Sequence, residues 1–298
     1  MRANPHLLLT LTAIFWAAHW IVARAVIPHT TPTGMAFWRW AAAIALLAPF
    51  AAPALAREWP AYWRARWPIL FFGTCGTVLY NCIGYMGIRD STATNAVLFQ
   101  SVTPGFIPLF AWLLFRERIR PLMAVGLAIS FAGVLALVTQ LDFRNLVEFH
   151  FNPGDLWLLA NTALWGLYTA CLRWKPAGMD GPGFMLAVML AGMITGIPLF
   201  LADAAMGGRT EVNAGVVLGI LFLAAFPSVL CYVMWNRGVA ALGPAKAGVY
   251  LHLIPLVGAF MAVFFLNESI QAHHIAGLAL ILTGVWLASR GRGAGGSA

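Results

Sequence analysis

Apolar residues run in ten long blocks along the chain, each ended by proline, glycine or a charged residue. A helix needs roughly 20 apolar residues to cross the hydrocarbon core of a bilayer, and the blocks are close to that length. Only short loops are left between them, so no sizeable soluble domain fits. The pattern predicts an all-α integral membrane protein with ten transmembrane helices, at residues 7–27, 32–51, 67–88, 92–115, 121–139, 155–174, 181–202, 214–240, 244–266 and 271–289.

The composition agrees with this pattern. Of the 298 residues, 61% are hydrophobic and 9% are charged, which a water-soluble domain of this size could not present to solvent. The first block follows Arg2 but is too long for a secretory signal and lacks a small-residue cleavage site, so we count it as a span. The cysteines lie in apolar blocks without CxxC spacing, as expected for small buried hydrophobes: Cys75, Cys82, Cys171 and Cys231.

Basic residues are distributed unevenly between the predicted loops. If successive loops alternate in side, all but five of the 18 lysines and arginines fall on one side. The five on the other side are Arg24, Arg39, Arg89, Arg144 and Arg209. The excess marks the cytoplasmic side, which predicts a multi-pass protein of the bacterial inner membrane with both termini in the cytoplasm. This orientation explains the net charge of +8, so no nucleic acid partner is expected.

Two loops carry a pattern of their own. Trp59, Trp63 and Trp67 are spaced by four residues with arginines between them, so a helix there would lie along the membrane surface with its indoles toward the acyl chains. We favour an aromatic and basic anchor over a lipid-sensing element. Residues 141–154 alternate loosely between apolar and charged positions and predict a connector on the outer face.

The two halves of the chain repeat one another. Offsets of 151 or 149 residues relate Pro104 to Pro255, Glu117 to Glu268, Gly126 to Gly277, Gly133 to Gly284 and Trp16 to Trp165. The repeat divides the chain into residues 1–140 and 155–298, with 141–154 as the connector. Because five spans is an odd number, the two repeats must have opposite orientations in the membrane. Such inverted repeats are typical of transporters that work by alternating access.

Two segments carry a resemblance to a known family: TNAVLFQSVTPGFIPLFAWLLFRERIRPLMAVGLAISFAGVLAL and AKAGVYLHLIPLVGAFMAVFFLNESIQAHHIAGLALILTGVWLA. Each has a proline in mid-helix, a glutamate at a helix end and spaced glycines. With the aromatic openings of spans one and six, they make nearly the whole chain resemble the ten-span branch of the drug/metabolite transporter superfamily, whose repeat unit is the EamA domain. The many aromatic residues are similar to those of bacterial exporters of aromatic amino acids and of methyl viologen.

A transport site is expected near the bilayer middle, on helices of both repeats, where polar groups mark it. Trp16, His19 and Trp20 share one face of span one by their spacing, as do Trp165 and Tyr168 in span six. Other candidate lining residues come from spans three, four, eight and nine: Tyr80, Asn81, Tyr85, Gln100, Tyr232, Trp235, Asn236 and Tyr250. Indole and phenol rings with few charges suit an amphiphilic solute that is itself aromatic or apolar.

Each candidate also has a plainer interpretation. Trp16 and Trp165 lie too deep for the aromatic belt of the membrane interface, so lining is favoured over packing. His19 either titrates, donates to a substrate carboxylate, or bonds to a neighbouring helix, which is the commoner arrangement. An interfacial belt or helix packing explains four residues as well as lining does: Tyr85, Tyr232, Trp235 and Tyr250.

The ten carboxylates are expected at span ends or in loops, so a midplane proton or sodium relay is not predicted. Transport down a gradient is the simpler mechanism, with His19 as the deep candidate for proton coupling. Glu117 and Glu268 begin the turns into spans five and ten, where capping of backbone N–H groups is favoured over gating. Pro104 and Pro255 each remove a mid-span hydrogen bond and predict a kink, either a hinge or static.

These features predict a secondary transporter that exports amino acids, aromatic or otherwise neutral, and similar amphiphilic metabolites. It is expected to work as a monomer without a cofactor or a metal. The alternatives are a broad drug or cation exporter, which would be expected to place an acid in its cavity, and a membrane protein without transport activity. An enzyme is not expected, because motifs such as HExxH and Gly-x-Ser-x-Gly do not occur.

Overall fold

The computed structural model describes residues 4–142, 144–145, 151–176, 178–179, 181–242, 247 and 249–290. Within this part of the chain the regular elements are all helical. The α-helices are α1 (Pro5–Val26), α2 (Pro32–Arg57), α3 (Trp59–Arg64), α4 (Arg66–Gly73), α5 (Tyr80–Asp90), α6 (Ala93–Gln100), α7 (Thr103–Phe115), α8 (Pro121–Val138), α10 (Pro153–Ala170), α11 (Pro182–Ala205), α12 (Ala214–Leu223), α13 (Cys231–Leu242), α15 (Leu253–Leu266) and α16 (Ala272–Arg290). Short 3-10 or π-helical segments join some of them: η1 (Ile27–His29), η2 (Thr74–Leu79), η3 (Cys171–Trp174), η4 (Ala224–Leu230) and η5 (Val249–His252).

Within the described residues, every predicted span coincides with one helix or with consecutive helical segments, which confirms the all-helical membrane fold. Residues 244–246 and 248 of the ninth predicted span lie outside the described residues. Six helices are long and apolar enough to cross a bilayer by themselves, and α6 with α7, bent by 47°, makes a seventh if counted as one span. Two further apolar helices are shorter, at Tyr250–Leu266 and Ala272–Ala288. The remaining predicted span, the sixth along the chain, is formed by α10. This helix is continuous but has polar residues on its buried side, among them Asp155, Asn161 and Thr162.

The two repeats begin with the same local signal. The side chain of Asn4 accepts a hydrogen bond from the backbone N–H of His6 at the start of α1, and Asn152 accepts one from Gly154 at the start of α10. In each case a proline follows the asparagine at the first helical position. An asparagine cap satisfies a free N–H, and proline lacks an N–H that a first turn leaves unpaired anyway. An Asn-Pro pair therefore starts both repeats.

The interruptions of the helices also recur in both repeats. The third span of the first repeat contains the π-helical segment η2, and the third span of the second contains η4. The fourth spans end at Arg116 and Asn267, 151 residues apart, and both residues have left-handed backbone conformation with φ of 55°. The repeat in the sequence is thus a repeat of helix geometry.

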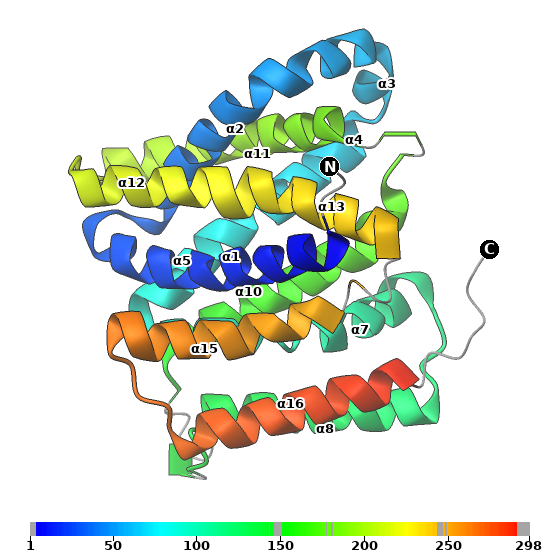
Figure 1. Ribbon diagram of the computed structural model, residues 1–298, viewed down its shortest axis with the longest axis vertical. Helices are drawn as coiled ribbons and strands as arrows, with labels where there is room; N and C mark the ends of the chain where they lie inside the picture. Colours follow the sequence, from blue (N-terminus) through cyan, green and yellow to red (C-terminus); the bar gives the residue numbers. More distant parts are fainter. Residues whose placement is uncertain are drawn as a thin grey trace.

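Each first span packs mainly on helices of the other repeat. In the first repeat α1 contacts α13 and α15, and in the second α10 contacts α5 and α7. Figure 1 shows the resulting layers, from α2 and α11 at the top to α8 and α16 at the bottom, with α1, α5 and α10 between them. Helices α2 and α11, and α8 and α16, pair across the two repeats. The centre of the molecule is therefore built from both repeats.

Glycines bring α8 and α16 into backbone contact. A Cβ atom on Gly126 would lie 2.4 Å from the backbone nitrogen of Ala288, and one on Gly284 would lie 2.4 Å from that of Ser130. Such distances are too short for any side chain, so the close approach requires glycine. These spaced glycines therefore serve helix packing.

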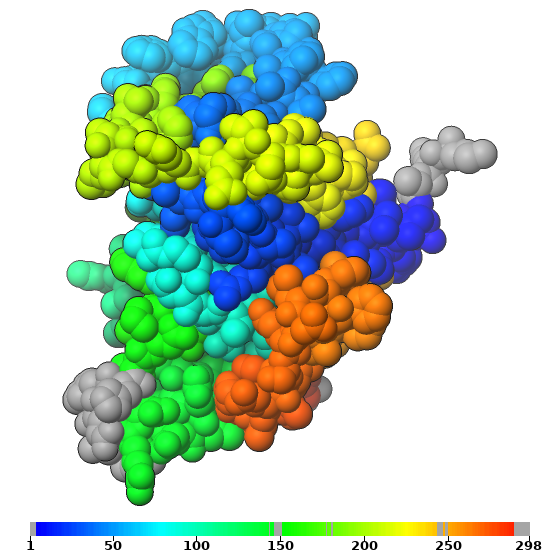
Figure 2. Space-filling view, turned by 90° about the vertical axis from the view of Figure 1, so that its left-hand side faces the viewer, coloured from blue at the N-terminus to red at the C-terminus, as the bar shows by residue number. Residues whose placement is uncertain are grey.

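The bundle has two ends, which we name by their equivalent glutamates. The Glu268 end holds the last turn of α1, the turn between α5 and α6 and the loop after α15; the Glu117 end is opposite and holds the loop after α7. Figure 2 looks onto the Glu268 end, where the blue, cyan and orange segments adjoin. Glu268 and Glu117 thus mark opposite faces of the bundle.

The tryptophan-rich loop forms two helices rather than one. Helix α3 ends at Arg64 and α4 begins at Arg66, so Trp59 and Trp63 lie on α3 and Trp67 on α4. The three tryptophans are 52%, 58% and 67% exposed. The guanidinium of Arg66 lies 5.6 Å from the ring centre of Trp63 and 5.5 Å from that of Trp67. Indoles and cations thus share one surface, as both interpretations of this loop require.

Candidate functional site

A buried arginine is the centre of the most polar site inside the bundle. Arg39 lies seven residues into α2, about 10 Å along the helix from its first residue. The two N–H groups of its Nη1 are shared among three acceptors: Oδ1 of Asn81 (2.5 Å), Oη of Tyr85 (2.7 Å) and Nε2 of His19 (2.9 Å). Its Nε donates to Oγ of Ser228 (2.9 Å). These five residues, from α1, α2, α5 and η4, are called the Arg39 cluster.

The cluster holds a positive charge without a negative partner. Arg39 is 5% exposed, and no carboxylate of the described residues forms an ion pair with it. A guanidinium has five N–H donors, and the two on Nη2 make no hydrogen bond within the described part of the chain. Burying an unpaired charge costs several kcal/mol. The cluster is therefore electrostatically suited to receive an anion.

The arginine also determines the state of His19. Because arginine donates and cannot accept hydrogen bonds, Nε2 of His19 must be the acceptor at 2.9 Å. The proton of the imidazole then resides on Nδ1, and the ring is neutral. His19 is 6% exposed and also lies 3.2 Å from the hydroxyl of Tyr85. It bonds to neighbouring helices, as the plainer interpretation predicts.

The position of Arg39 corrects two sequence predictions. The count of basic residues assigns it to the external loops, and the lining is expected to carry few charges, whereas the structure places its guanidinium inside the bundle beside polar groups of three other segments. An arginine two turns inside a span can normally extend to the membrane surface. Only the hydrogen-bond partners of Arg39 show that its side chain points into the bundle instead. The polar residues His19 and Asn81 in other spans were the one sequence feature that could have indicated a buried polar site.

A second group of predicted residues forms an aromatic array. The rings of Tyr80 and Trp165 are 4.8 Å apart, and Trp165 stacks on Tyr168 at the same distance. The hydroxyl of Tyr80 donates to Oε1 of Gln100 (3.3 Å), whose amide donates to Oδ1 of Asn161 (3.0 Å). Asn161 is fully buried and returns a hydrogen bond to the backbone oxygen of Tyr80 (2.5 Å). Sequence reasoning missed Asn161, although it lies one turn before Trp165 on the same face.

A third group lies between α1 and the eighth span. The rings of Trp16 and Trp235 are 5.4 Å apart, and the indole N–H of Trp16 donates to the backbone oxygen of Pro227 (3.3 Å). Near the start of α1, Nδ1 of His6 lies 2.5 Å from the hydroxyl of Tyr250. The structure thus joins Trp16 and Trp235, predicted residues of different repeats, and places predicted Tyr250 beside His6, which the sequence reasoning did not name.

The predicted lining residues differ in exposure. Four of them are buried: His19, Trp20, Asn81 and Tyr85. Asn236 is exposed. Eight keep part of their surface accessible: Trp16, Tyr80, Gln100, Trp165, Tyr168, Tyr232, Trp235 and Tyr250. The partly accessible set therefore keeps ring surface that the protein does not cover.

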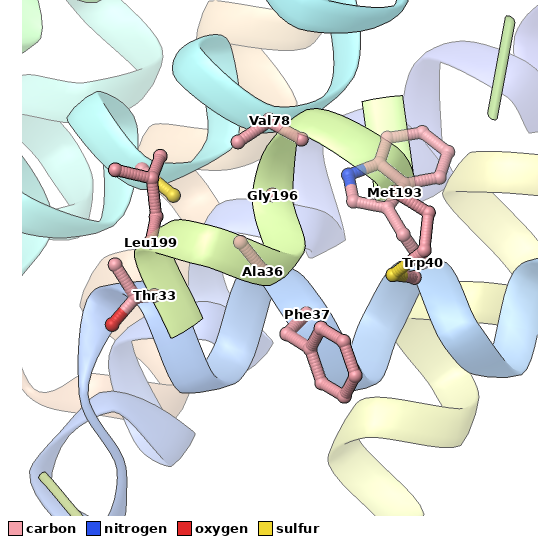
Figure 3. Close-up of a pocket in the computed structure, with 9 residues that line it drawn as sticks. Thr33, Ala36, Phe37, Trp40, Val78, Met193, Gly196 and Leu199 are labelled. Atoms are coloured by element: carbon pink, nitrogen blue, oxygen red, sulfur yellow. The ribbon is translucent and has the colours of Figure 1, made fainter. Parts of the chain in front are cut away.

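A separate pocket lies between α2 and α11 and is shown in Figure 3. Its walls come from α2, η2, α5 and α11, and Thr33 is their one hydroxyl-bearing residue. The lining residues are Thr33, Ala36, Phe37, Trp40, Val78, Cys82, Met193, Gly196 and Leu199. None of the predicted lining residues is among them. Trp40 connects the pocket to the Arg39 cluster, because its ring centre is 5.1 Å from the guanidinium.

The two mid-span prolines lie just after breaks in their spans. Helix α6 ends at Gln100, α7 begins at Thr103, and the two are bent by 47°. Pro104 occupies the first turn of α7, where its missing N–H removes no helix hydrogen bond. Pro255 lies in the first turn of α15, directly after η5. Both prolines therefore start a helix beside a break instead of interrupting a continuous one.

The equivalent glutamates make different contacts. Glu268 accepts hydrogen bonds from the backbone N–H groups of Ala93 and Thr94, both at 2.8 Å, at the start of α6. It therefore caps a helix of the other repeat, whereas the sequence interpretation places the cap at the turn where Glu268 itself lies. Glu117 pairs with Arg173 at 2.9 Å, and both side chains are about half exposed. Exposed pairs of this kind contribute roughly 0.2–1 kcal/mol.

Metal ligation has no support in the described residues, where no group of three or more His, Cys, Asp or Glu side chains is placed to hold an ion.

Comparisons with known proteins place the chain among transporters. The EamA-like transporter family matches residues 4–139 and 152–290. An uncharacterized transporter of Archaeoglobus fulgidus is 27% identical over 292 residues, covering 96% of this chain and 98% of the relative. The uncharacterized transporter YyaM of Bacillus subtilis is 23% identical over 288 residues, covering 96% and 93%.

Two further matches concern substrate and fold. A probable terminal-alkyne amino-acid exporter of Streptantibioticus cattleyicolor is 25% identical over 282 residues, covering 95% of this chain and 92% of the relative. A crystal structure with 19% sequence identity superposes with a TM-score of 0.62 and covers 97% of this chain and 99% of the other. The second match establishes the fold alone.

Proposed function

Since the chain belongs to the EamA-like transporter family and is a multi-pass membrane transporter, not an enzyme, we propose that it exports amino acids, aromatic or otherwise neutral, by alternating access. The observation that carries this proposal is the buried, uncompensated charge of Arg39. A substrate carboxylate is the anion that every amino acid brings to such a site. We further propose that the protein lies in the bacterial inner membrane with both termini in the cytoplasm and acts as a monomer.

The chemistry of the Arg39 cluster favours a carboxylate. The two unused N–H donors of Nη2 can meet one or both carboxylate oxygens in a charge-assisted hydrogen bond, which is stronger than a neutral one. Asn81 and Tyr85 hold the guanidinium in place through Nη1, so little side-chain entropy is lost when an anion binds. A cationic drug would instead meet an unpaired positive charge, which disfavours the alternative of a broad cation exporter.

The aromatic arrays suit the rest of such a substrate. Trp165 and Tyr168 are stacked, Tyr80 lies tilted beside them, and all three side chains are partly accessible. Ring faces attract an ammonium group through cation–π contact and an aromatic side chain through stacking. The similarity to the probable amino-acid exporter of Streptantibioticus cattleyicolor supports the same substrate class.

The proposal is tested by flux into liposomes that carry the purified full-length protein. We expect saturable uptake of radiolabelled L-phenylalanine that competes with unlabelled L-phenylalanine. Arg39→Gln is expected to weaken apparent affinity about tenfold or more, since a hydrogen bond to a charged group contributes roughly 1.5–3 kcal/mol. Arg39→Lys keeps the charge, so its apparent affinity is expected to lie between those of the wild type and Arg39→Gln.

Arg237→Gln serves as the matched control, because Arg237 is an exposed arginine of the eighth span. It is expected to leave the affinity unchanged. Size-exclusion profiles of all variants show whether each is folded. The proposal fails if no neutral amino acid moves faster than in empty liposomes, or if folded Arg39→Gln protein keeps the wild-type affinity. Faster movement of methyl viologen than of L-phenylalanine would favour the cation exporter.

A further inference from the structure

A buried carboxylate lies at the Glu268 end, outside the site described above. Asp155 is 0% exposed and lies in the first turn of α10. Its Oδ1 accepts hydrogen bonds from the hydroxyl of Ser91 and from the side-chain amide of Asn95 (2.9 Å). Ser91 and Asn95, which belong to the first repeat, are also buried. These three residues, called the Asp155 cluster, join the two repeats.

Two oxygen atoms of this cluster lack a partner. Oδ2 of Asp155 and Oδ1 of Asn95 are both buried and accept no hydrogen bond within the described residues. They belong to the two groups that the 2.9 Å hydrogen bond already joins. A carboxylic acid and an amide commonly pair through two such bonds, N–H to one oxygen and O–H to the other. A single proton on Oδ2 supplies the missing donor, with Oδ1 of Asn95 as its acceptor.

No basic group neutralises the carboxylate at short range. Within the part of the chain that the structure describes, Asp155 forms no ion pair. The facing titratable groups are His273 on α16 and its neighbour His274, whose ring centre lies 4.0 Å from that of His273 in an edge-to-face arrangement. From α5, Arg89 and Asp90 pair with each other at 3.0 Å. Burying an ionised carboxylate without a counter-charge is costly, so burial favours the neutral acid.

We infer that Asp155 is a proton-binding site that must be loaded for the Glu268 end to close. In the closed arrangement the proton resides on Oδ2 of Asp155, between α10 of one repeat and α6 of the other. When this end opens, water reaches the carboxylate and the proton can leave. Ionisation then holds the two repeats apart at this end, because closing would bury the bare charge.

The site extends the proposed function and differs from the sequence interpretation of coupling. His19 accepts a hydrogen bond from Arg39 and stays neutral without any titration. Asp155 was expected at a span end and is found there, but buried instead of solvated. A carboxylate in a first helical turn is also favoured by the helix dipole. That stabilisation requires no burial and leaves no orphaned oxygen, so the dipole does not account for the cluster.

The first test detects the proton directly and needs no substrate. Infrared difference spectra of the purified protein between low and high pH are expected to contain the C=O stretch of a buried carboxylic acid. Asp155→Asn is expected to remove that band, and Asn95→Ala is expected to shift it because the O–H loses its acceptor. Asp142→Asn, the matched control, removes an exposed aspartate and is expected to leave the band in place.

The second test measures exchange of L-phenylalanine in liposomes with equal pH on both sides. The wild-type rate is expected to fall as pH rises, because the ionised cluster resists closure, and Asp155→Asn, which stays neutral, is expected to remove this dependence. The inference is overturned if no acid band is lost in folded Asp155→Asn protein. It is also overturned if Na⁺ at constant pH, and not pH, controls the rate. Absence of any exchange would refute the amino-acid proposal, while the infrared arm would still decide the role of Asp155.

Discussion

Two buried ionisable side chains, the base Arg39 and the acid Asp155, contact separate sets of neutral groups. Arg39 is surrounded by hydroxyl, amide and imidazole groups, and Asp155 by a hydroxyl and an amide. Neutral partners orient a charged group without cancelling its charge. Arg39 is therefore suited to bind an anion, and Asp155 to bind a proton.

Trp165 offers a residue-scale test of the aromatic array. Trp165→Ala removes the ring that stacks on Tyr168 and contacts Tyr80. If the ring contacts substrate, KM for L-phenylalanine is expected to rise about two- to tenfold, because an aromatic pair contributes roughly 0.5–1.5 kcal/mol. Flux measurements in liposomes check this.

The control is Trp157→Ala, which removes a tryptophan of the same helix that is 38% exposed. It is expected to leave KM unchanged. An unchanged KM in folded Trp165→Ala protein would show that Trp165 serves helix packing and does not contact the substrate.

At this scale the sequence named candidate residues but not the contacts between them. Polar residues inside apolar blocks identified His19 and Asn81, because hydrocarbon tolerates few of them. Arg39 was assigned to a loop, since a long side chain near a span end normally reaches water. Its neighbours are 20 to 189 residues away in sequence. Contacts over such separations are set by helix packing, which no local pattern encodes.

Among the elements, the helix breaks recur in equivalent places. The π-helical segments η2 and η4 interrupt the third spans, and the left-handed residues Arg116 and Asn267 end the fourth. Equivalent breaks give both repeats the same points at which backbone geometry can change. The sequence predicted the break near Pro104 and Pro255 but not the π-helical segments, because residues such as Thr, Cys and Val do not distinguish π from α geometry.

The contact between α8 and α16 gives an element-scale prediction. Gly126→Ala places a Cβ 2.4 Å from the backbone nitrogen of Ala288, which can be relieved only by separating the helices. A loss of stability of about 1–3 kcal/mol is expected, as for other overpacked sites. A lower thermal midpoint of the purified protein would show it.

Gly215→Ala makes the same change where a Cβ meets only a side-chain oxygen of Asn213, at 3.4 Å. It is expected to maintain or raise the midpoint, since alanine favours a helix more than glycine does. Equal midpoints for the two variants would contradict the close-packing argument.

For the whole molecule, polar contacts between distant segments are concentrated at one end. At the Glu268 end, Arg24 donates to the backbone oxygens of Ile88 (2.5 Å) and Arg89 (2.9 Å), and Thr31 donates to Asp203 (2.5 Å). Figure 2 shows these segments adjoining. At the Glu117 end, the polar contacts of the described residues include the exposed pair of Glu117 with Arg173 and the contact of His6 with Tyr250. Aromatic contacts also occur there, such as those of Trp174 with Phe71 and Phe115. This distribution fits a state closed at the Glu268 end.

Glu268→Ala tests that closure. Two backbone N–H groups of α6 lose their acceptor, so hydrogen exchange measured by mass spectrometry is expected to speed up over residues 93–100. The equivalent change at the other end, Glu117→Ala, removes only an exposed pair and is expected to leave exchange in this segment unchanged. Equal protection of α6 in both variants would contradict the role of Glu268.

By itself the sequence determined the all-helical membrane fold, the ten blocks and the repeat, together with the family to which they belong. The thickness of the bilayer and the lack of water inside it impose length and apolarity on each span separately. These features can therefore be recognised in the sequence alone, without knowing which helices are in contact. Only the tertiary structure decided that Arg39 is buried without a carboxylate partner among the described residues, that Glu268 caps α6 of the other repeat, and that Asp155 is enclosed beside Asn95. Those facts depend on which helices pack together, because hydrogen bonds and buried charges between distant segments form only when the helices are in contact.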